Sequence, residues 1–269
     1  MIDIDIRKEL YGSNGIMKLD VELHIKKGEF IALMGQSGSG KTTLLRVLAG
    51  LEESEGDVIV EGLSWSGMTP QLREIGFVFQ DYALFDNMSV EQNLLFVNRD
   101  KLLAQKLLDM TELTALARQN VKVLSGGQKQ RVSLCRAMMK KPKLLLMDEP
   151  LSALDTQMRS KLQKEIKQFH STFGTTTIMV SHDAGEVYAL ADRVCVMEDG
   201  EIVKDNLVKD LFGKKEKIYK AEVLKVLKNN EKTLAMVFIA GELMEIEVKE
   251  SAKVGDGIDI TLNPKVNFE

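Results

Sequence analysis

The chain has 269 residues, which is longer than a typical single domain of about 100–150 residues and allows two domains. Its apolar share of 44% and charged share of 28% are ordinary for a globular protein and exclude a disordered or fibrous chain. The formal net charge of −4 provides no overall electrostatic reason to bind nucleic acid, so we expect no nucleic-acid partner.

The chain start and the cysteines indicate the compartment. Residues 1–6 alternate acidic and apolar side chains, unlike the basic start and continuous apolar core of a signal peptide. No stretch approaches the roughly 20 apolar residues of a membrane-spanning helix. Cys135 and Cys195 stand among apolar residues outside any metal-ligand spacing, which is typical of buried free thiols. We therefore expect a reducing, cytoplasmic compartment.

Short apolar runs predict the sheet. Residues 19–25 alternate apolar and polar side chains, which predicts a strand with one solvated face. Residues 30–34, 75–79, 144–147 and 177–180 are instead continuous apolar runs, typical of strands that are covered on both faces. We expect these four to form a parallel sheet.

A glycine-rich loop follows the run at 30–34. Its sequence, Gly35-Gln36-Ser37-Gly38-Ser39-Gly40-Lys41-Thr42, has the spacing of a P-loop, whose backbone N–H groups form a cup for phosphate oxygens. Lys41 would place its charge between the β- and γ-phosphates, and the Thr42 hydroxyl would hold Mg²⁺. A helix that begins near Lys41 would direct its positive end at the same phosphates. The candidate nucleotide-binding residues here are Gly35, Gln36, Ser37, Gly38, Ser39, Gly40, Lys41, Thr42 and Thr43.

Helical patterns occupy the middle of the chain, and strand-like patterns occupy its end. The pattern is helical over about 88–140, which we interpret as a helical subdomain. Apolar residues then recur at intervals of three or four from Met158 to Phe173, which predicts an amphipathic helix covering the sheet. After residue 212, a lysine-rich hinge at 213–217 precedes strand-like runs. We expect a small β domain there.

A second helix start that could bind a phosphate group lies at Leu124-Ser125-Gly126-Gly127-Gln128. Ser125 is a favourable N-cap residue, and the two glycines leave backbone N–H groups uncovered. Further along, Asp148 and Glu149 are neighbours at the end of a predicted strand, so their side chains diverge. One carboxylate can then serve Mg²⁺ while the other faces the γ-phosphate.

The glycine-rich loop at 35–42 and the helix start at 124–128 together resemble the Walker A loop and signature motif of an ABC transporter ATP-binding subunit. Other segments resemble this family's motifs in the same order, over residues 1 to about 212. They are Gln80 (Q-loop), Leu144 to Glu149 (Walker B strand and catalytic glutamate), Ser152-Ala153-Leu154-Asp155 (D-loop), His182 (switch histidine) and Tyr11 (an aromatic that stacks on adenine). The resemblance implies an α/β fold of the P-loop ABC cassette type, with a mixed sheet and a helical subdomain.

The resemblance also implies roles and partners. ATP and Mg²⁺ are the expected cofactors, with Thr42, Gln80 and Asp148 on the metal and Lys41, Gln80, Glu149 and His182 in catalysis. In the family, the signature motif completes the ATP site of a partner subunit. We therefore expect a homodimer in which Ser125, Gly126, Gly127, Gln128 and Asp155 serve the nucleotide across the interface. The segment that follows Gln80 is expected to touch a membrane permease.

The subfamily and the cargo are predicted from the same resemblance. The absence of a membrane span and the presence of a C-terminal β segment favour an importer. Residues 219–268 resemble a single TOBE or molybdate-binding type repeat, and we set the domains at 1–212 and 213–269. The expected cargo is molybdate or tungstate, although the Ser-Ala-Arg-Asn run often seen in oxyanion-binding repeats is absent. Sulfate, iron, phosphonate or polyamine import, or a non-transport ABC ATPase, are the alternatives.

The expected location is the cytoplasmic face of the membrane, where the chain would be bound peripherally to integral permease subunits. A periplasmic or surface substrate-binding protein would act with it indirectly through that permease.

Overall fold

A computed structural model describes residues 1–12, 15–152, 154–212, 217–228, 233–239, 242–248, 253–255 and 257–262. The chain forms two compact units, Met1–Lys209 and Asp210–Glu269. The predicted domain boundary after residue 212 lies close to this division. Most of the predicted hinge, residues 213–216, is outside the described residues, as are parts of the segment at 219–268 that resembles a TOBE repeat.

A six-stranded sheet forms the centre of the first unit, with strand order β10-β9-β3-β8-β7-β6. Its strands are β3 (Phe30–Met34), β6 (Ile75–Val78), β7 (Leu144–Asp148), β8 (Thr176–Val180), β9 (Arg193–Glu198) and β10 (Glu201–Leu207). Neighbouring strands from β9 to β6 are parallel, and β10 is antiparallel to β9. The expected parallel arrangement of the four apolar runs is confirmed, and the antiparallel edge makes the sheet mixed.

The apolar runs are continuous because both faces of this sheet are covered. In β7, Leu145 and Met147 belong to one apolar cluster, whereas Leu144 and Leu146 belong to another. Successive side chains of a strand point to opposite faces, so a strand covered on both sides must be apolar at every position.

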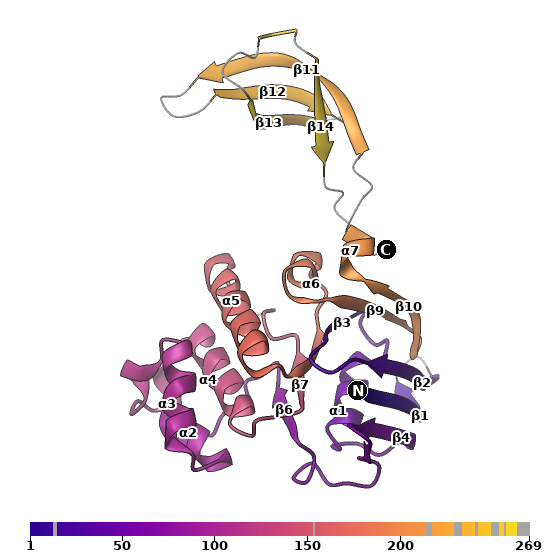
Figure 1. The fold of residues 1–269 in the computed structure, drawn as a ribbon, viewed down its shortest axis with the longest axis vertical. Coiled ribbons are helices and arrows are strands. Elements are labelled where there is room, and N and C mark those ends of the chain that lie inside the picture. The colour runs from indigo at the N-terminus through magenta and orange to yellow at the C-terminus, as the bar shows by residue number, and fades with distance from the viewer. Residues whose placement is uncertain are drawn as a thin grey trace. The chain divides into compact units, whose positions relative to one another are not determined.

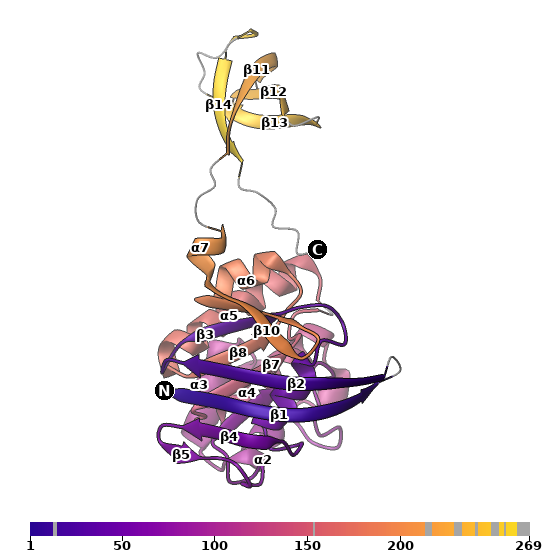
Figure 2. The same ribbon diagram turned by 90° about the vertical axis from the view of Figure 1, so that its right-hand side faces the viewer.

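A second sheet covers one face, with strand order β2-β1-β4-β5. It contains β1 (Ile2–Gly12), β2 (Gly15–Ile25), β4 (Glu55–Val60) and β5 (Leu63–Ser64), which lie side by side in Figure 2. β2 buries Leu19, Val21, Leu23 and Ile25 and exposes alternate residues, as predicted for a strand with one solvated face.

Most helices of the first unit cover the other face, whereas the helix at 41–48 packs into the apolar cluster that the second sheet covers. The helices of the first unit are α1 (Lys41–Leu48), α2 (Val90–Val97), α3 (Lys101–Met110), α4 (Gly126–Met138), α5 (Thr156–Phe173), α6 (Ala184–Leu190) and α7 (Val208–Phe212), the last ending just beyond it. Short 3₁₀ turns occur at Thr114–Leu116 and Val121–Val123. In Figure 1, α2, α3 and α4 gather beside α5 and away from β1, β2 and β4. The predicted amphipathic helix is α5, which buries Leu162, Ile166 and Phe169 against the sheet.

The second unit is a four-stranded antiparallel sheet in the order β13-β12-β11-β14. Its strands are β11 (Lys217–Lys228), β12 (Thr233–Ile239), β13 (Glu242–Val248) and β14 (Gly257–Leu262). The strand-like runs predicted after residue 212 therefore form strands.

A buried ion pair joins α4 to α5. Arg131 Nε lies 2.9 Å from Glu165 Oε2, and the two side chains are 12% and 7% exposed. Neither carboxylate oxygen of Glu165 accepts a hydrogen bond of good geometry from the described residues. Burial therefore outweighs the attraction of Arg131 and raises the pKa of Glu165 from 4.5 to about 7.

The raised pKa of Glu165 predicts a pH-dependent stability. Between about pH 4.5 and 7 the folded chain holds a proton on Glu165 that the unfolded chain releases. The contribution of this proton to the free energy of unfolding is therefore complete below pH 4.5 and is lost as the pH rises through about 7. Urea unfolding at several pH values, followed through the fluorescence of the single tryptophan, Trp65, measures this decline. Glu165→Gln is expected to remove it, and Glu112→Gln, at an exposed neighbour, is expected to keep it. Equal slopes for the native chain and Glu165→Gln would contradict the assignment.

Candidate functional site

The predicted P-loop joins β3 to α1. Gly40 is the N-cap of α1 with φ 99°, and Gly35 has φ 143°. A Cβ on Gly35 would lie 2.1 Å from the carbonyl oxygen of Met197 in β9, so only glycine fits there. The loop is thus held against the neighbouring strand of the sheet.

Lys41 is the buried cation of this loop. Its Nζ donates hydrogen bonds to the carbonyl oxygens of Gly35 at 2.9 Å and Gln36 at 2.7 Å, and to Ser39 Oγ at 3.2 Å. Burial lowers the pKa of Lys41, and the charges of Glu149 and Asp148 oppose that shift. The ammonium group is held inside the backbone cup, where a phosphate group would meet it.

The strand order brings three further predicted residues to the same edge. β3, β8, β7 and β6 are adjacent and parallel, so the residues that follow their carboxyl ends share one edge of the sheet. The P-loop follows β3, His182 follows β8, Glu149 follows β7 and Gln80 follows β6.

Asp148 and Thr42 contact each other at this edge. The Thr42 hydroxyl donates to Asp148 Oδ1 at 3.3 Å. Asp148 is 8% exposed; burial raises the pKa of its carboxyl, and the hydrogen bond from Thr42 opposes the shift. A hydroxyl and a carboxylate beside a phosphate-binding cup are hard oxygen donors of the kind that Mg²⁺ prefers.

Glu149 faces His182. Its Oε1 lies 3.7 Å from His182 Nδ1, and the two side chains are 29% and 69% exposed. The backbone of Glu149 has φ 45°, which is uncommon for a non-glycine residue, and its N–H donates to the carbonyl of Val180 at 3.1 Å. Strained backbone held by its surroundings is frequent at functional sites. The diverging side chains expected for Asp148 and Glu149 are observed, because one contacts Thr42 and the other His182.

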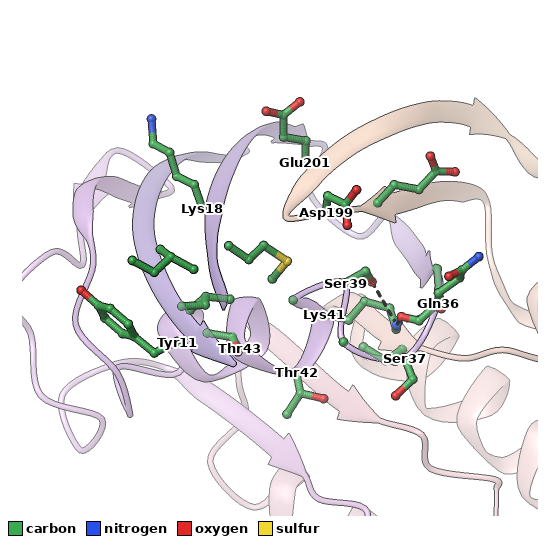
Figure 3. A pocket seen from close by; sticks show the side chains of 18 of the residues that line it. Tyr11, Lys18, Gln36, Ser37, Ser39, Lys41, Thr42, Thr43, Asp199 and Glu201 are labelled. Atoms are coloured by element: carbon green, nitrogen blue, oxygen red, sulfur yellow. Dashed lines mark hydrogen bonds between the residues drawn. The ribbon is translucent and has the colours of Figure 1, made fainter. Parts of the chain in front are cut away.

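A cleft of about 1110 Å³ contains the P-loop, Glu149 and His182. The predicted residues among its lining are Tyr11, Gly35, Gln36, Ser37, Gly38, Ser39, Gly40, Lys41, Thr42, Thr43, Glu149 and His182. Tyr11 stands at the rim (Figure 3), 78% exposed, and its hydroxyl donates to Glu9 Oε2 at 2.9 Å. This exposed ring is available for contact with a flat ligand.

The cleft also has residues that sequence reasoning missed. Lys18 of β2 and three acidic residues at the β9–β10 turn, Glu198, Asp199 and Glu201, line it. Figure 3 shows Asp199 and Glu201 across the cleft from Tyr11. A hairpin turn was readable from Asp199-Gly200, but its place beside β2 comes from tertiary contacts, such as the hydrogen bond from Asp20 N to the Gly200 carbonyl at 2.9 Å.

Other predicted residues do not line the cleft. Ser125 is the N-cap of α4 in a capping box, in which its Oγ accepts from Gln128 N and Gln128 Oε1 accepts from Ser125 N. Asp155 is the N-cap of α5 and accepts hydrogen bonds from Gln157 N and Met158 N. Gln80 is exposed after β6, and Ala153 of the predicted D-loop lies outside the described residues. Within one chain, Ser125, Gly126, Gly127, Gln128, Asp155 and Gln80 are thus not brought to the P-loop cleft.

The family of the chain follows from its sequence similarity to the spermidine/putrescine import ATP-binding protein PotA of Thermotoga maritima. It is 39% identical over 266 residues, which cover 91% of this chain and 72% of that protein. The chain belongs to the ABC transporter ATP-binding family. The model of the ABC transporter family matches residues 19–152 of this ABC protein.

Two further relatives and two solved structures extend the comparison. This ABC protein is 45% identical to the sulfate/thiosulfate import ATP-binding protein CysA 1 of Agrobacterium fabrum over 72% of this chain and 60% of that one. It is 43% identical to the Fe(3+) ions import ATP-binding protein FbpC 2 of Rhizobium meliloti over 76% of this chain. The chain spans only 60% and 54% of the lengths of these two relatives.

The dimeric ATP-binding cassette MJ0796, solved with ADP and Pi, matches 77% of this ABC protein and 99% of its own chain, with a TM-score of 0.68 and 29% identity. The structure of cbiO1 of Clostridium perfringens, part of an ABC transporter complex, matches 80% of this chain and 91% of its own with a TM-score of 0.69 and 28% identity. The predicted P-loop ABC cassette fold is confirmed.

Among the described residues, no helix is both long and apolar enough to cross a lipid bilayer.

Proposed function

We propose that the chain is the ATP-hydrolysing subunit of an ABC importer. The observation that carries this proposal is the cleft in which Lys41, inside its phosphate cup, lies beside the contacting pair Glu149 and His182. Phosphoryl transfer to water mainly requires positioning and neutralisation of charge, and these groups supply both. The import proteins among the relatives support the importer assignment.

The predicted residues in and near the cleft take separate roles in this proposal. Lys41 and the P-loop amides bind the phosphates, while Tyr11 stacks on adenine. Glu149 orients or deprotonates the attacking water, and His182 holds the γ-phosphate and that water in register. Thr42, Asp148 and Gln80 would hold Mg²⁺, which neutralises phosphate charge when it is bound. The 3.3 Å contact between Thr42 and Asp148 supports two of these three ligands.

We further propose that the second half of the ATP site comes from another copy of the chain. Ser125 to Gln128 and Asp155 do not line the cleft of their own chain; Ser125 and Asp155 are exposed, and Gln128 is half-buried. The amides of Gly126 and Gly127 belong to the first turn of α4, where backbone donors have no partner within the helix. In a homodimer, this turn would receive the γ-phosphate of the nucleotide that the partner binds. The dimeric MJ0796 cassette supports this arrangement.

A matched pair of serines separates the capping role from the proposed dimer role. Ser89 caps α2 with the same capping box that Ser125 forms on α4, with Gln92 in place of Gln128. Each Ser→Ala change is expected to lower the free energy of unfolding by about 1 kcal/mol. Only Ser125→Ala is expected also to weaken ATP-dependent dimerisation, measured by light scattering of the Glu149→Gln chain with ATP and Mg²⁺. Equal dimerisation by the two variants would count against the role of Ser125 at the interface.

The cargo proposal follows the relatives. Sulfate or thiosulfate, Fe(3+) ions and polyamines are the cargoes named for them, so these alternatives have better support than molybdate or tungstate. We propose one of these three as the cargo. The chain would bind to permease subunits at the cytoplasmic face of the membrane and would not contact the cargo itself.

Two measurements test the proposal. Hydrolysis of ATP by the full chain with Mg²⁺ tests the enzymatic part, and absence of turnover with and without membranes from the source cells would overturn it. Cells lacking the chain, complemented with the native chain or with Glu149→Gln, are then supplied with labelled sulfate, ferric iron, spermidine or molybdate. Loss of uptake of one cargo, restored only by the native chain, identifies it. Loss of molybdate uptake alone would restore the oxyanion prediction, and no loss would argue against import of these cargoes.

A further inference from the structure

The segment directly after Gln80, residues 81–85, has an unusual backbone. Tyr82 and Ala83 are consecutive non-glycine residues with φ 64° and 46°, both in the left-handed region. Such conformations are strained and persist only where the surroundings hold them. The segment, which we call the connecting segment, leads from β6 toward α2.

Two buried side chains hold the connecting segment. Arg136 of α4, 9% exposed, donates from Nη1 to the Ala83 carbonyl at 2.6 Å and from Nη2 to the Tyr82 carbonyl at 3.3 Å. Its guanidinium also lies 5.4 Å from the centre of the Phe85 ring. Asn93 of α2, fully buried, accepts from Phe85 N at 2.9 Å and donates to the Phe85 carbonyl at 3.2 Å. The left-handed backbone is therefore fixed by hydrogen bonds on both sides.

The side chain of Tyr82 reaches the other end of α4. A Cβ placed on Gly126 would lie 3.1 Å from the Tyr82 hydroxyl oxygen, so this oxygen rests against the first residue of the helix. Arg136 and Gly126 belong to the same helix, one near its last turn and one at its start. A single helix thus fixes the backbone of Tyr82 and also receives its hydroxyl. An oxygen at a helix N-terminus is electrostatically favoured by the helix dipole.

We propose that Tyr82 is a positioning residue that couples the connecting segment to the first turn of α4. A displacement of the segment would be transmitted through the Tyr82 ring to Gly126 and through the backbone of Tyr82 and Ala83 to Arg136, so that α4 moves with the segment. This inference rests on the proposed function, in which that first turn completes the ATP site of a second chain. Tyr82 would then set how well two chains close over ATP, without contacting the nucleotide in its own cleft.

The proposal predicts that changes at Tyr82 affect the closure of two chains and ATP hydrolysis but not the binding of ADP to a single chain. Binding of ADP to a single chain uses the P-loop cleft, whose lining does not include Tyr82 or Gly126. Closure of two chains and hydrolysis use the first turn of α4. A residue that merely supports the fold would alter both properties together, whereas a positioning residue alters only the second.

The test uses the full chain. ADP affinity is measured by calorimetry with Mg²⁺, kcat is measured by phosphate release, and ATP-dependent dimerisation is measured with Glu149→Gln added to each variant. Tyr82→Ala is expected to weaken dimerisation and lower kcat by about tenfold, within the range found for residues that modulate coupling between sites. Tyr82→Phe, which removes only the oxygen at Gly126, is expected to cause a smaller loss of about threefold, in the same range. Both should keep the native ADP affinity, and Tyr188→Phe on α6 is the matched control.

Two results would overturn the inference while leaving the proposed function intact. One is an active native chain whose dimerisation and kcat are unchanged in both Tyr82 variants. The other is a loss of ADP affinity as large as the loss of dimerisation, which would assign Tyr82 to support of the fold. If the native chain itself neither hydrolyses ATP nor dimerises with it, the proposed function fails, and this inference fails with it.

Discussion

Replacing Glu149 with glutamine is expected to reduce ATP turnover by a factor of about 10²–10⁴, the contribution typical of a positioned general base. The amide keeps the shape of the carboxylate, so the strained backbone at φ 45° and the fold should be retained. It removes the negative charge 3.7 Å from His182 Nδ1 that would orient or deprotonate the attacking water. The binding of phosphates by Lys41 and the P-loop amides is unaffected, so ATP should still bind.

The same variant is expected to trap the closed homodimer with ATP, because in the proposed function closure would require bound ATP and opening would require its hydrolysis. Phosphate release and size-exclusion chromatography at saturating ATP and Mg²⁺ measure the two effects. Glu201→Gln is the matched control, since it makes the same chemical change at another carboxylate that lines the cleft. A Glu149→Gln chain that remains monomeric with ATP, or that keeps native turnover, would count heavily against the proposed site.

Replacing Gly35 with alanine is expected to lower the free energy of unfolding more than the Ser→Ala and Gly174→Ala replacements do, and to abolish ATP binding. The new Cβ would lie 2.1 Å from the Met197 carbonyl oxygen and 3.1 Å from its carbonyl carbon. These are backbone atoms of β9, which pairs with β3 through Leu33–Cys195 and Met34–Val196. Neither partner can move without breaking the sheet, so the P-loop must shift. We expect a loss of about 3 kcal/mol, since overpacking and backbone strain cost about 1–3 kcal/mol each.

Gly174→Ala provides the control for Gly35→Ala. Gly174 ends α5 with φ 60°, and a Cβ there would meet no atom within 4 Å, so this variant incurs backbone strain alone, about 1–2 kcal/mol. Urea unfolding followed through Trp65, which is 1% exposed in the first unit, measures both variants. Calorimetry with ADP measures nucleotide binding. Equal destabilisation by the two variants, or native ADP affinity in Gly35→Ala, would show that the close approach to β9 does not constrain the loop.

The cargo shows a limit of motif reasoning. The residues that resemble this family's motifs belong to the ATPase machinery, which does not contact the cargo in the proposed function. The C-terminal segment at 219–268 favoured molybdate or tungstate, whereas relatives at 39–45% identity are named for sulfate, ferric iron and polyamines. Features that serve ATP hydrolysis are compatible with all of these cargoes.

Local features of the site were predictable because consecutive residues make them. The P-loop, the start of α1 at Lys41, the N-cap at Ser125 and the alternation in β2 all depend on backbone geometry within a few residues. The same holds for the apolar runs, because a strand covered on both faces must be apolar at each position. The sequence by itself therefore determined the ABC cassette class, the phosphate cup and the helix starts.

Only the tertiary structure decided which of these features meet. Thr42 and Asp148 are 106 positions apart, and their contact depends on the strand order β3-β8-β7, which no local pattern specifies. The same is true of the Glu149–His182 pair, the acidic β9–β10 turn at the cleft, and the Tyr82 hydroxyl against Gly126. Such contacts are stabilised by the packing of distant segments around a common core, so their geometry is a property of the assembled sheet and helices.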